Sequence, residues 1–179
     1  MTGATAASAA SNRKLTFLLG GARSGKSSHA ESLTTAFPSP WAYIATAQAY
    51  DDEMRARIAL HRSRRGEGWV TVDAPLDLVG AIEALPDHQP VLIDCLTLWL
   101  TNHMLADHDV EAECWRLADV LSRPRGPWSV VSNEVGLGIV PDNALARRFR
   151  DAAGRLNQQV AAAADSVLMM VAGLPLKVK

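Results

Sequence analysis

The sequence predicts an α/β fold of three layers, in which a mostly parallel β-sheet is covered by helices on both faces. Short apolar runs of strand type alternate with segments of helical period, the pattern of parallel strands joined by right-handed crossovers. A glycine-rich motif, G-x-x-x-x-G-K-S, follows the first apolar run and opens the first helical segment. No repeat or interdomain linker interrupts the chain, so we expect one domain over residues 14–179 after a disordered tail over residues 1–13.

Composition and charge narrow the class of protein. Hydrophobic residues make up 48% and charged residues 21%, as in ordinary globular chains, and the net charge is -1. This balance argues against a general nucleic-acid or anionic-membrane binder, and no apolar run approaches the about 20 residues of a membrane span. Cys95 and Cys114 lack zinc-site spacing, and the first residues do not resemble a secretory signal. We therefore expect a cytoplasmic protein.

The glycine-rich motif is expected to bind a nucleoside triphosphate with magnesium. Glycines let main-chain N–H groups wrap a phosphate chain, and the helix that follows adds its positive N-terminus. Lys26 would reach the outer phosphates, and the Ser27 hydroxyl would ligate the magnesium ion. The motif, between a strand at residues 15–19 and a helix, predicts a RecA-like P-loop NTPase fold; the alternative is a glycine-rich turn that binds nothing. The predicted cradle comprises Gly20, Gly21, Ala22, Arg23, Ser24, Gly25, Lys26 and Ser27.

A second strand is expected at residues 41–46, followed by a helix with an acidic start at residues 52–64. On that helix Met54, Ile58 and His61 share one face, so His61 points with the apolar stripe. Two interpretations stay open. Periodicity alone favours a packed histidine with a satisfied hydrogen bond, and the alternative is an unprotonated imidazole that acts as a nucleophile in a cleft.

The end of this helix is basic. Arg62, Arg64 and Arg65 fit a solvated helix end near the favourable C-terminal dipole, but arginine forks also match phosphate oxygens. A short strand is expected next at residues 69–73, and a short helix at residues 77–85.

Residues 90–94 are an apolar run that ends in a carboxylate, the form of a Walker-B strand. A lone acid at the end of a buried strand is costly unless it meets a cation or hydrogen-bond donors. Asp94 is therefore a candidate to orient the magnesium ion, directly or through water. The alternative is that Asp94 caps the helical segment at residues 96–105.

The second half of the chain continues the alternation, with helices expected at residues 107–121 and 142–165 and strands at 128–132 and 166–171. In the longest helix an apolar stripe is expected to face the core. The stripe comprises Leu145, Phe149, Ala152, Leu156, Val160 and Ala163. Beside it, Arg147, Arg148 and Arg150 would face either water or an anionic ligand.

Four strings in collinear order point to a family: GGARSGKS, YIATAQAYDDEMRARIALHR, VLIDCLTLWLTN and SNEVGLGIVPDNALARRFRDAAGRLNQQVAAAAD. Over residues 14–179 the chain resembles the adenosylcobinamide kinase / adenosylcobinamide-phosphate guanylyltransferase family of cobalamin biosynthesis. The resemblance implies a bifunctional enzyme that phosphorylates adenosylcobinamide with ATP or GTP. The enzyme would then transfer GMP from GTP to that phosphate, giving adenosylcobinamide-GDP and pyrophosphate.

The resemblance also implies roles for single residues. GMP would pass through a covalent phosphoramidate on His61, with Lys26 as the second catalytic residue, and Mg²⁺ would be held by Ser27 and Asp94. Besides the cradle, the implied nucleotide-binding residues are Ala45, Thr46, Ala47, Arg62, Ser63, Arg64, Arg65, Asp73 and Asp94. The resemblance implies a homotrimer, and Glu134, Arg147 and Arg150 are our candidates for corrinoid contacts.

Two rival functions stay open. One is a P-loop metabolite kinase without a covalent intermediate, in which His61 is structural. The other is a nucleotide-sensing or assembly protein that binds GTP without turnover. The presence of Lys26, Ser27 and Asp94, the parts of a working magnesium site, disfavours the second.

Overall fold

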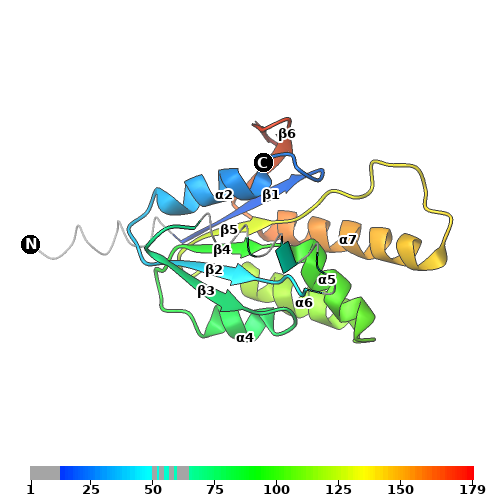
Figure 1. Ribbon diagram of the computed structural model, residues 1–179, viewed down its shortest axis with the longest axis horizontal. Helices are drawn as coiled ribbons and strands as arrows, with labels where there is room; N and C mark the ends of the chain where they lie inside the picture. Colours follow the sequence, from blue (N-terminus) through cyan, green and yellow to red (C-terminus); the bar gives the residue numbers. More distant parts are fainter. Residues whose placement is uncertain (1–12, 50–51, 53–54, 57–58, 60–64) are drawn as a thin grey trace, which may run out of the picture.

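The computed structural model describes residues 13–49, 52, 55–56, 59 and 65–179. Across these residues, seven strands form one sheet in the order β3-β2-β4-β5-β1-β6-β7 (Figure 1). Every neighbouring pair is parallel except β6 and β7, so the mostly parallel sheet is confirmed. The strands are β1 Lys14–Gly20, β2 Trp41–Ala45, β3 Trp69–Asp73, β4 Val91–Asp94, β5 Pro127–Val131, β6 Ser166–Val171 and β7 Leu174–Lys177.

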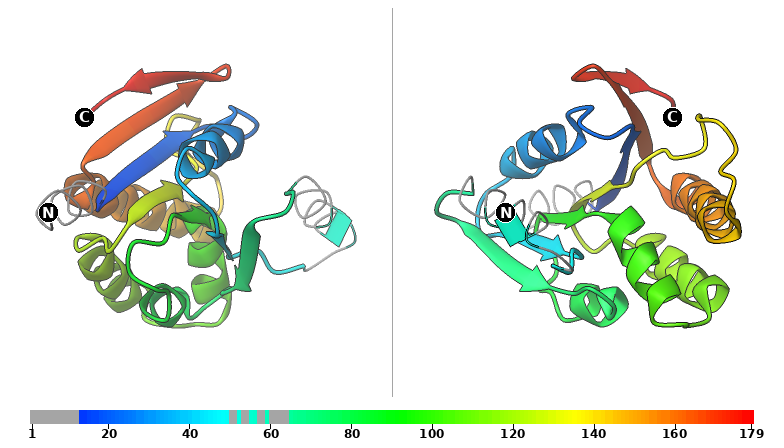
Figure 2. Two further views of the ribbon diagram at one scale, coloured as in Figure 1. Left: turned by 90° about the vertical axis from the view of Figure 1, so that its left-hand side faces the viewer. Right: turned by 45° about the vertical axis from the view of Figure 1, so that its right-hand side comes forward.

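Helices cover both faces of the sheet, so the three layers are confirmed (Figure 2). Helix α2 packs on one face, and α4, α5, α6 and α7 pack on the other. The helices are α2 Lys26–Thr35, α4 Leu78–Glu83, α5 Leu96–Leu105, α6 Val110–Leu121 and α7 Ala144–Ala163.

The alternation of side chains along the central strands divides the core in two. In β2, Ile44 belongs to the large apolar cluster under α4–α7, whereas its neighbour Tyr43 belongs to a small cluster under α2. In β4, Ile93 and Leu92 divide in the same way. Successive residues of a strand point to opposite faces, so each central strand contributes to both layers.

Two helices begin later than the sequence predicts. Helix α6 starts at Val110 instead of residue 107, because Asp107 has a left-handed backbone (φ 56°) and the Asp109 carboxylate caps the helix. Helix α7 starts at Ala144, where the Asn143 side chain is the cap, instead of at residue 142. Leu145, in the first turn of α7, is 55% exposed, so its assignment to the buried stripe was wrong.

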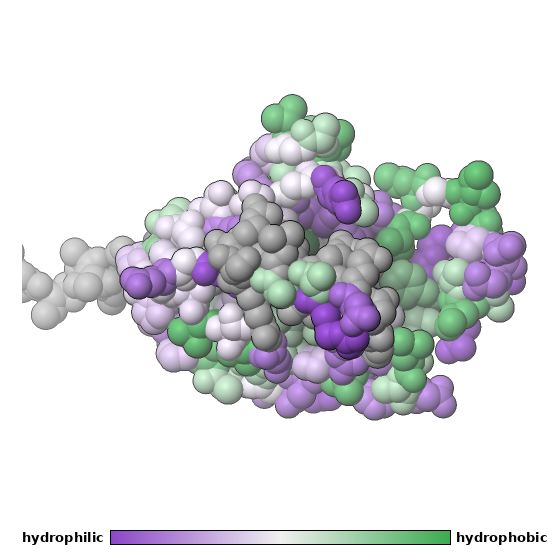
Figure 3. Space-filling view, in the orientation of Figure 1, coloured by the Kyte–Doolittle hydropathy of each residue, from purple (hydrophilic) through white to green (hydrophobic). Residues whose placement is uncertain are grey.

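Strand β7 was not predicted. It pairs antiparallel with β6 at the edge of the sheet, and it contains Pro175, which an edge strand tolerates. Leu174 and Leu176 are exposed on it, and Figure 3 shows hydrophobic surface where this hairpin projects.

Within the predicted helix at residues 52–64, the four described residues are helical: Asp52, Arg55, Ala56 and Ala59. The other residues of that helix lie outside the described part of the chain. No helix among the described residues is long and apolar enough to cross a membrane.

Candidate functional site

The glycine-rich loop joins the end of β1 to the start of α2, as the motif predicts. Gly20 (φ 150°) and Gly25 (φ 95°) both have backbones that favour glycine. A Cβ on Gly20 would lie 2.6 Å from the Met170 carbonyl oxygen, and one on Gly25 would lie 3.2 Å from the Gly173 Cα. The Gly173 N–H also donates to the Ser24 carbonyl (3.0 Å). The β6–β7 hairpin therefore braces the loop, and its close approach requires glycine at both positions. Phosphate binding by the loop stays a prediction.

Lys26 lies over the loop that precedes it. Its ammonium donates to the Gly21 carbonyl (2.6 Å), and the residue is only 6% exposed. Burial lowers the pKa of Lys26 below the usual 10.5, although the negative charge of Asp94 opposes this effect. A charge held with so little water favours a phosphate oxygen as a partner. Ser27 follows in the first turn of α2 and is half-buried.

The register of the sheet aligns the ends of several strands at one edge. Ala45 pairs with Asp73 on one side and with Asp94 on the other, and Asp94 pairs with Val131. Val131 in turn pairs with Leu18, two residues before the glycine-rich loop. Asp73 and Asp94 therefore lie at the same carboxyl edge as the loop, where parallel α/β sheets bind ligands.

Asp94 is oriented by a residue that the sequence did not single out. The Tyr43 hydroxyl donates to Asp94 Oδ2 (3.1 Å) from the neighbouring strand. Burial, with a further contribution from the Asp94 charge, raises the pKa of Tyr43 well above its usual value, so the phenol stays protonated as a donor. The N-cap of α5 is Cys95, so the alternative of Asp94 as the helix cap was wrong.

The side-chain oxygens at this edge fit as ligands of a magnesium ion that also binds the phosphates of a nucleotide. In the described part of the chain, no cluster of three or more His, Cys, Asp or Glu side chains forms a protein-only metal site. Mg²⁺ is usually held by one or two protein oxygens together with substrate phosphates and water. The half-buried Asp94 carboxylate and the Ser27 hydroxyl match such a set.

Arg65 lies across the ring of the same tyrosine. Its guanidinium carbon is 3.5 Å from the Tyr43 ring centroid, and Trp69 meets that ring edge-on (6.1 Å, 78°). The Nη1 atom of Arg65 is buried and has no hydrogen-bond partner among the residues that the structure describes. The structure thus brings Arg65, Tyr43 and Asp94 together.

Thr46, predicted to contact the nucleotide, is wholly buried at the end of β2. Its hydroxyl donates to the Cys95 carbonyl (2.7 Å) and accepts from the Cys95 N–H (2.8 Å). The Asn102 amide donates to the carbonyls of Thr46 and Pro75, both at 2.8 Å. Sequence reasoning missed Asn102, although a polar residue in the apolar run LTLWLTNHML was the available signal. A nucleotide contact by Thr46 stays a prediction.

Most of the other residues predicted for the catalytic and nucleotide site lie in a part of the chain that the structure does not describe. His61, Arg62, Ser63 and Arg64 lie outside the described residues. Ala47, one residue after Thr46, is half-buried, and its predicted contact stays untested.

The three candidate corrinoid contacts make local interactions. The Glu134 N–H donates to the Gly20 carbonyl (3.0 Å), which places this residue beside the loop. Arg147 donates to the carbonyls of Pro141 (2.9 Å) and Asp142 (2.6 Å), and Arg150 pairs with Asp151. Arg147 thus holds its own loop, and a corrinoid contact by any of the three stays a prediction.

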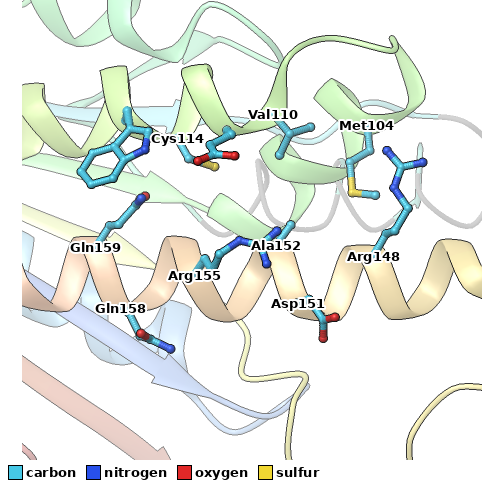
Figure 4. Close-up of a pocket in the computed structure, with 11 residues that line it drawn as sticks. Met104, Val110, Cys114, Arg148, Asp151, Ala152, Arg155, Gln158 and Gln159 are labelled. Carbon is cyan, nitrogen blue, oxygen red and sulfur yellow. The ribbon is translucent and has the colours of Figure 1, made fainter.

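A separate groove of about 440 Å³ lies between α6 and α7, on the face of the sheet opposite α2 (Figure 4). Arg148 and Arg155 extend from α7 on one side, and Cys114 and Trp115 lie on α6. Arg148, predicted to face either water or an anionic ligand, lines this groove, and none of the described residues predicted for the nucleotide, magnesium or corrinoid sites does.

Comparison with known proteins gives a family match and similar proteins over most of the chain. Residues 16–178 match the model of the family described as cobinamide kinase / cobinamide phosphate guanyltransferase. The chain is 46% identical to the bifunctional adenosylcobalamin biosynthesis protein CobP of Pseudomonas aeruginosa, over 90% of this chain and 95% of that protein. It is 43% identical to the bifunctional adenosylcobalamin biosynthesis protein CobU of Escherichia coli, over 89% and 97%.

Solved structures resemble the fold at much lower identity. The type III secretion ATPase EscN of enteropathogenic E. coli matches with a TM-score of 0.51 at 13% identity, over 89% of this chain and 43% of that one. The flagellar accessory protein FlaH of Methanocaldococcus jannaschii matches with a TM-score of 0.50 at 11% identity, over 94% and 79%. These likenesses agree with the predicted RecA-like P-loop fold.

Proposed function

The chain belongs to the cobinamide kinase / cobinamide phosphate guanyltransferase family, and from this premise we propose the reactions that it catalyses. It is a bifunctional enzyme of cobalamin biosynthesis that phosphorylates adenosylcobinamide with ATP or GTP. It then transfers GMP from GTP to adenosylcobinamide phosphate, giving adenosylcobinamide-GDP and pyrophosphate. The observation that carries the proposal is the family match over residues 16–178, because that range contains Lys26, Asp94 and His61.

In the kinase step, a hydroxyl of adenosylcobinamide attacks the γ-phosphorus of the triphosphate. The bond from the γ-phosphorus to the bridging oxygen breaks, the nucleoside diphosphate leaves, and the hydroxyl proton is lost to solvent or to a nearby base. Lys26 moves its ammonium from the Gly21 carbonyl to the phosphates and stabilises the charge that develops there. The main-chain N–H groups of the loop hold the phosphates in line.

In the guanylyl step, an unprotonated nitrogen of His61 attacks the α-phosphorus of GTP, and pyrophosphate leaves. The phosphate oxygen of adenosylcobinamide phosphate then attacks the same phosphorus, the P–N bond breaks, and neutral His61 is restored. A histidine with an ordinary pKa supplies the unprotonated nucleophile near neutral pH. Arg65, together with Arg62, Ser63 and Arg64, is proposed to contact the nucleotide beside His61.

Three further points belong to the proposal. Asp94 and Ser27 hold a Mg²⁺ ion, which neutralises phosphate charge when it is bound. The enzyme is cytoplasmic, and it works as a homotrimer. The cradle, Ala45, Thr46, Ala47 and Asp73 complete the nucleotide site at the carboxyl edge of the sheet.

The test compares wild-type and His61→Ala protein, each mixed with magnesium and GTP labelled at the α- or the γ-phosphate. We expect acid-labile label on denatured wild-type protein from α-labelled GTP alone, and none on His61→Ala. In a second mixture that also contains adenosylcobinamide, the variant should still transfer the γ-phosphate to it, because Lys26 and Asp94 are intact.

The two rival functions give different results in the same experiment. Transfer of γ-phosphate without protein-bound label in the wild type would select a simple P-loop kinase. GTP binding without release of phosphate or pyrophosphate would select a non-catalytic GTP-binding protein. Equal loss of both activities in His61→Ala would contradict separate roles for the two steps.

A further inference from the structure

We infer that Tyr43 is a positioning residue for both halves of the reaction, and this inference rests on the proposed function. Its hydroxyl holds the Asp94 carboxylate for the metal, and its ring holds Arg65 so that one guanidinium nitrogen meets an anionic oxygen of the bound nucleotide. Tyr43 lies in a predicted strand and begins one of the four strings that point to the family, but no role follows for it from either.

The hydroxyl acts on Asp94 from a fixed position. Tyr43 is 5% exposed, it lies in the middle of β2, and its ring belongs to the small apolar cluster under α2. A carboxylate at a strand end has free rotation unless a donor fixes it, and the 3.1 Å bond from the phenol fixes one oxygen. The other acceptor positions of Asp94 then point in a defined direction for a metal ion.

The ring is held as firmly as the hydroxyl. Trp69 packs edge-on against Tyr43, and Trp41 packs against Trp69 at 5.5 Å between ring centroids. These rings form a wall from β2 and β3 on which the Arg65 guanidinium lies at 3.5 Å. A planar cation over an aromatic face is stabilised by the ring quadrupole, and Arg is suited to such stacking.

The unmet donor on Arg65 points to the class of ligand. Stacking leaves the N–H groups in the guanidinium plane available, yet Nη1 is buried and unpartnered within the described part of the chain. Leaving a buried charged donor unpaired is costly, so such an atom indicates a missing partner. The partner that matches a guanidinium N–H is an anionic phosphate oxygen. Because Arg65 lies on Tyr43, whose hydroxyl bonds Asp94 at the carboxyl edge of the sheet, that oxygen belongs to the nucleotide proposed to bind at this edge.

Two substitutions of Tyr43 separate the role of its hydroxyl from the role of its ring. Tyr43→Phe removes the hydroxyl and keeps the ring, whereas Tyr43→Leu removes both. For Tyr43→Phe we expect Mn²⁺ binding in the presence of GTP, followed by electron paramagnetic resonance, to weaken about 3- to 10-fold, the range of one hydrogen bond. Its protein-bound label from α-labelled GTP should stay within about twofold of wild type at saturating metal. For Tyr43→Leu we expect the rate of labelling to fall about 30-fold further, with a raised KM for GTP, as for a desolvated cation–π contact.

Control variants show whether a loss of packing explains these effects. Val160→Ala trims the core on the opposite face of the sheet and should change neither readout beyond about twofold. Arg65→Lys keeps the charge but loses the planar stack, so it should reproduce the labelling defect of Tyr43→Leu and leave Mn²⁺ affinity unchanged. It also replaces Tyr43→Leu in the test if that variant does not fold.

The outcomes that overturn the inference are distinct from a failure of the proposed function. Unchanged Mn²⁺ affinity in Tyr43→Phe rejects the role of the hydroxyl, and equal labelling rates in Tyr43→Phe and Arg65→Lys reject the role of the ring. A wild type that takes up no α-label rejects the guanylyl-histidine route instead. The Mn²⁺ measurement then still decides whether Tyr43 positions Asp94.

Discussion

The two faces of the sheet differ: one buries most of the apolar core, and the other carries the candidate site. The face under α4–α7 buries the large apolar cluster, which includes Ile93, Leu96 and Trp99. The face under α2 has a small apolar cluster beside Lys26 and Asp94. The two functions meet in β4, where Ile93 belongs to the large apolar cluster and the next residue, Asp94, is a candidate magnesium ligand. Because apolar burial is concentrated on the face without the predicted site residues, we expect most of the stability to come from that face.

The largest expected effect is on the packing face. Trp99 is 1% exposed, and its indole N–H donates to the Leu76 carbonyl (2.9 Å). Trp99→Ala should lower the free energy of unfolding by about 3–5 kcal/mol, the range for truncating a large aromatic core residue. Urea unfolding measures this, with Trp99→Phe as the milder control. A loss below about 1 kcal/mol would contradict the assignment of stability to this face.

The matched change on the other face is Lys26→Met. Removing this charge from the cradle should reduce kcat/KM of the kinase step about 100- to 1000-fold, as for loss of one preorganised donor to developing charge. The urea midpoint should not fall, because the charge is buried at a cost in the free protein. If Lys26→Met unfolds as easily as Trp99→Ala, the division between the faces fails.

Asn102 connects α5, on the packing face, to the strand ends at the site edge. Asn102→Ala leaves the Thr46 and Pro75 carbonyls without this donor, so we expect a loss of about 1–3 kcal/mol in unfolding free energy. Thr101→Val on the same helix is the control, because the Thr101 hydroxyl donates to the Thr97 carbonyl within the helix and does not reach the strand ends. Equal losses in the two variants would show that the bridge contributes nothing.

The smallest effect is a pH dependence on the α2 face. Burial lowers the pKa of Lys26 below 10.5 in the free protein, and bound phosphate favours the charged form. GTP affinity should therefore fall as pH rises through that lowered value. The sign for folding is opposite: the unfolded chain binds more protons between the lowered pKa and 10.5, so this residue adds stability as pH rises there. Titration calorimetry across the alkaline range tests the binding term, and Lys26→Met should abolish it.

Most helices and strands were predictable from hydrophobic periodicity and from the residues that interrupt helices and strands. The strands at residues 69–73 and 166–171 match β3 and β6 residue for residue, because each is a short apolar run between clear breaks. The starts of α6 and α7 depend on which of several polar residues caps the helix, and spacing does not decide between Asp107 and Asp109. Strand β7 was missed because Pro175 and its exposed neighbours give no strand pattern.

The site was predictable where chemistry is local in sequence. The glycine-rich loop and Asp94 follow from spacing and from the end of an apolar run, and the structure places them at one edge. The partners of Tyr43 and Asn102 were not predictable, because Asp94 lies 51 positions from Tyr43 and Thr46 lies 56 positions from Asn102. For Asn102 the sequence offered only its polar character within an apolar run. The role of His61 rests on the resemblance to the family, because His61 lies outside the described residues.

The brace on the glycine-rich loop has a consequence for biosynthesis of the protein. The loop leaves the ribosome early, but Gly173, against which Gly25 packs, is translated far later. A nascent chain that stops before the β6–β7 hairpin therefore has the nucleotide motif without the backbone that supports it. The loop therefore gains its full backbone support only when nearly the whole sheet has been synthesised.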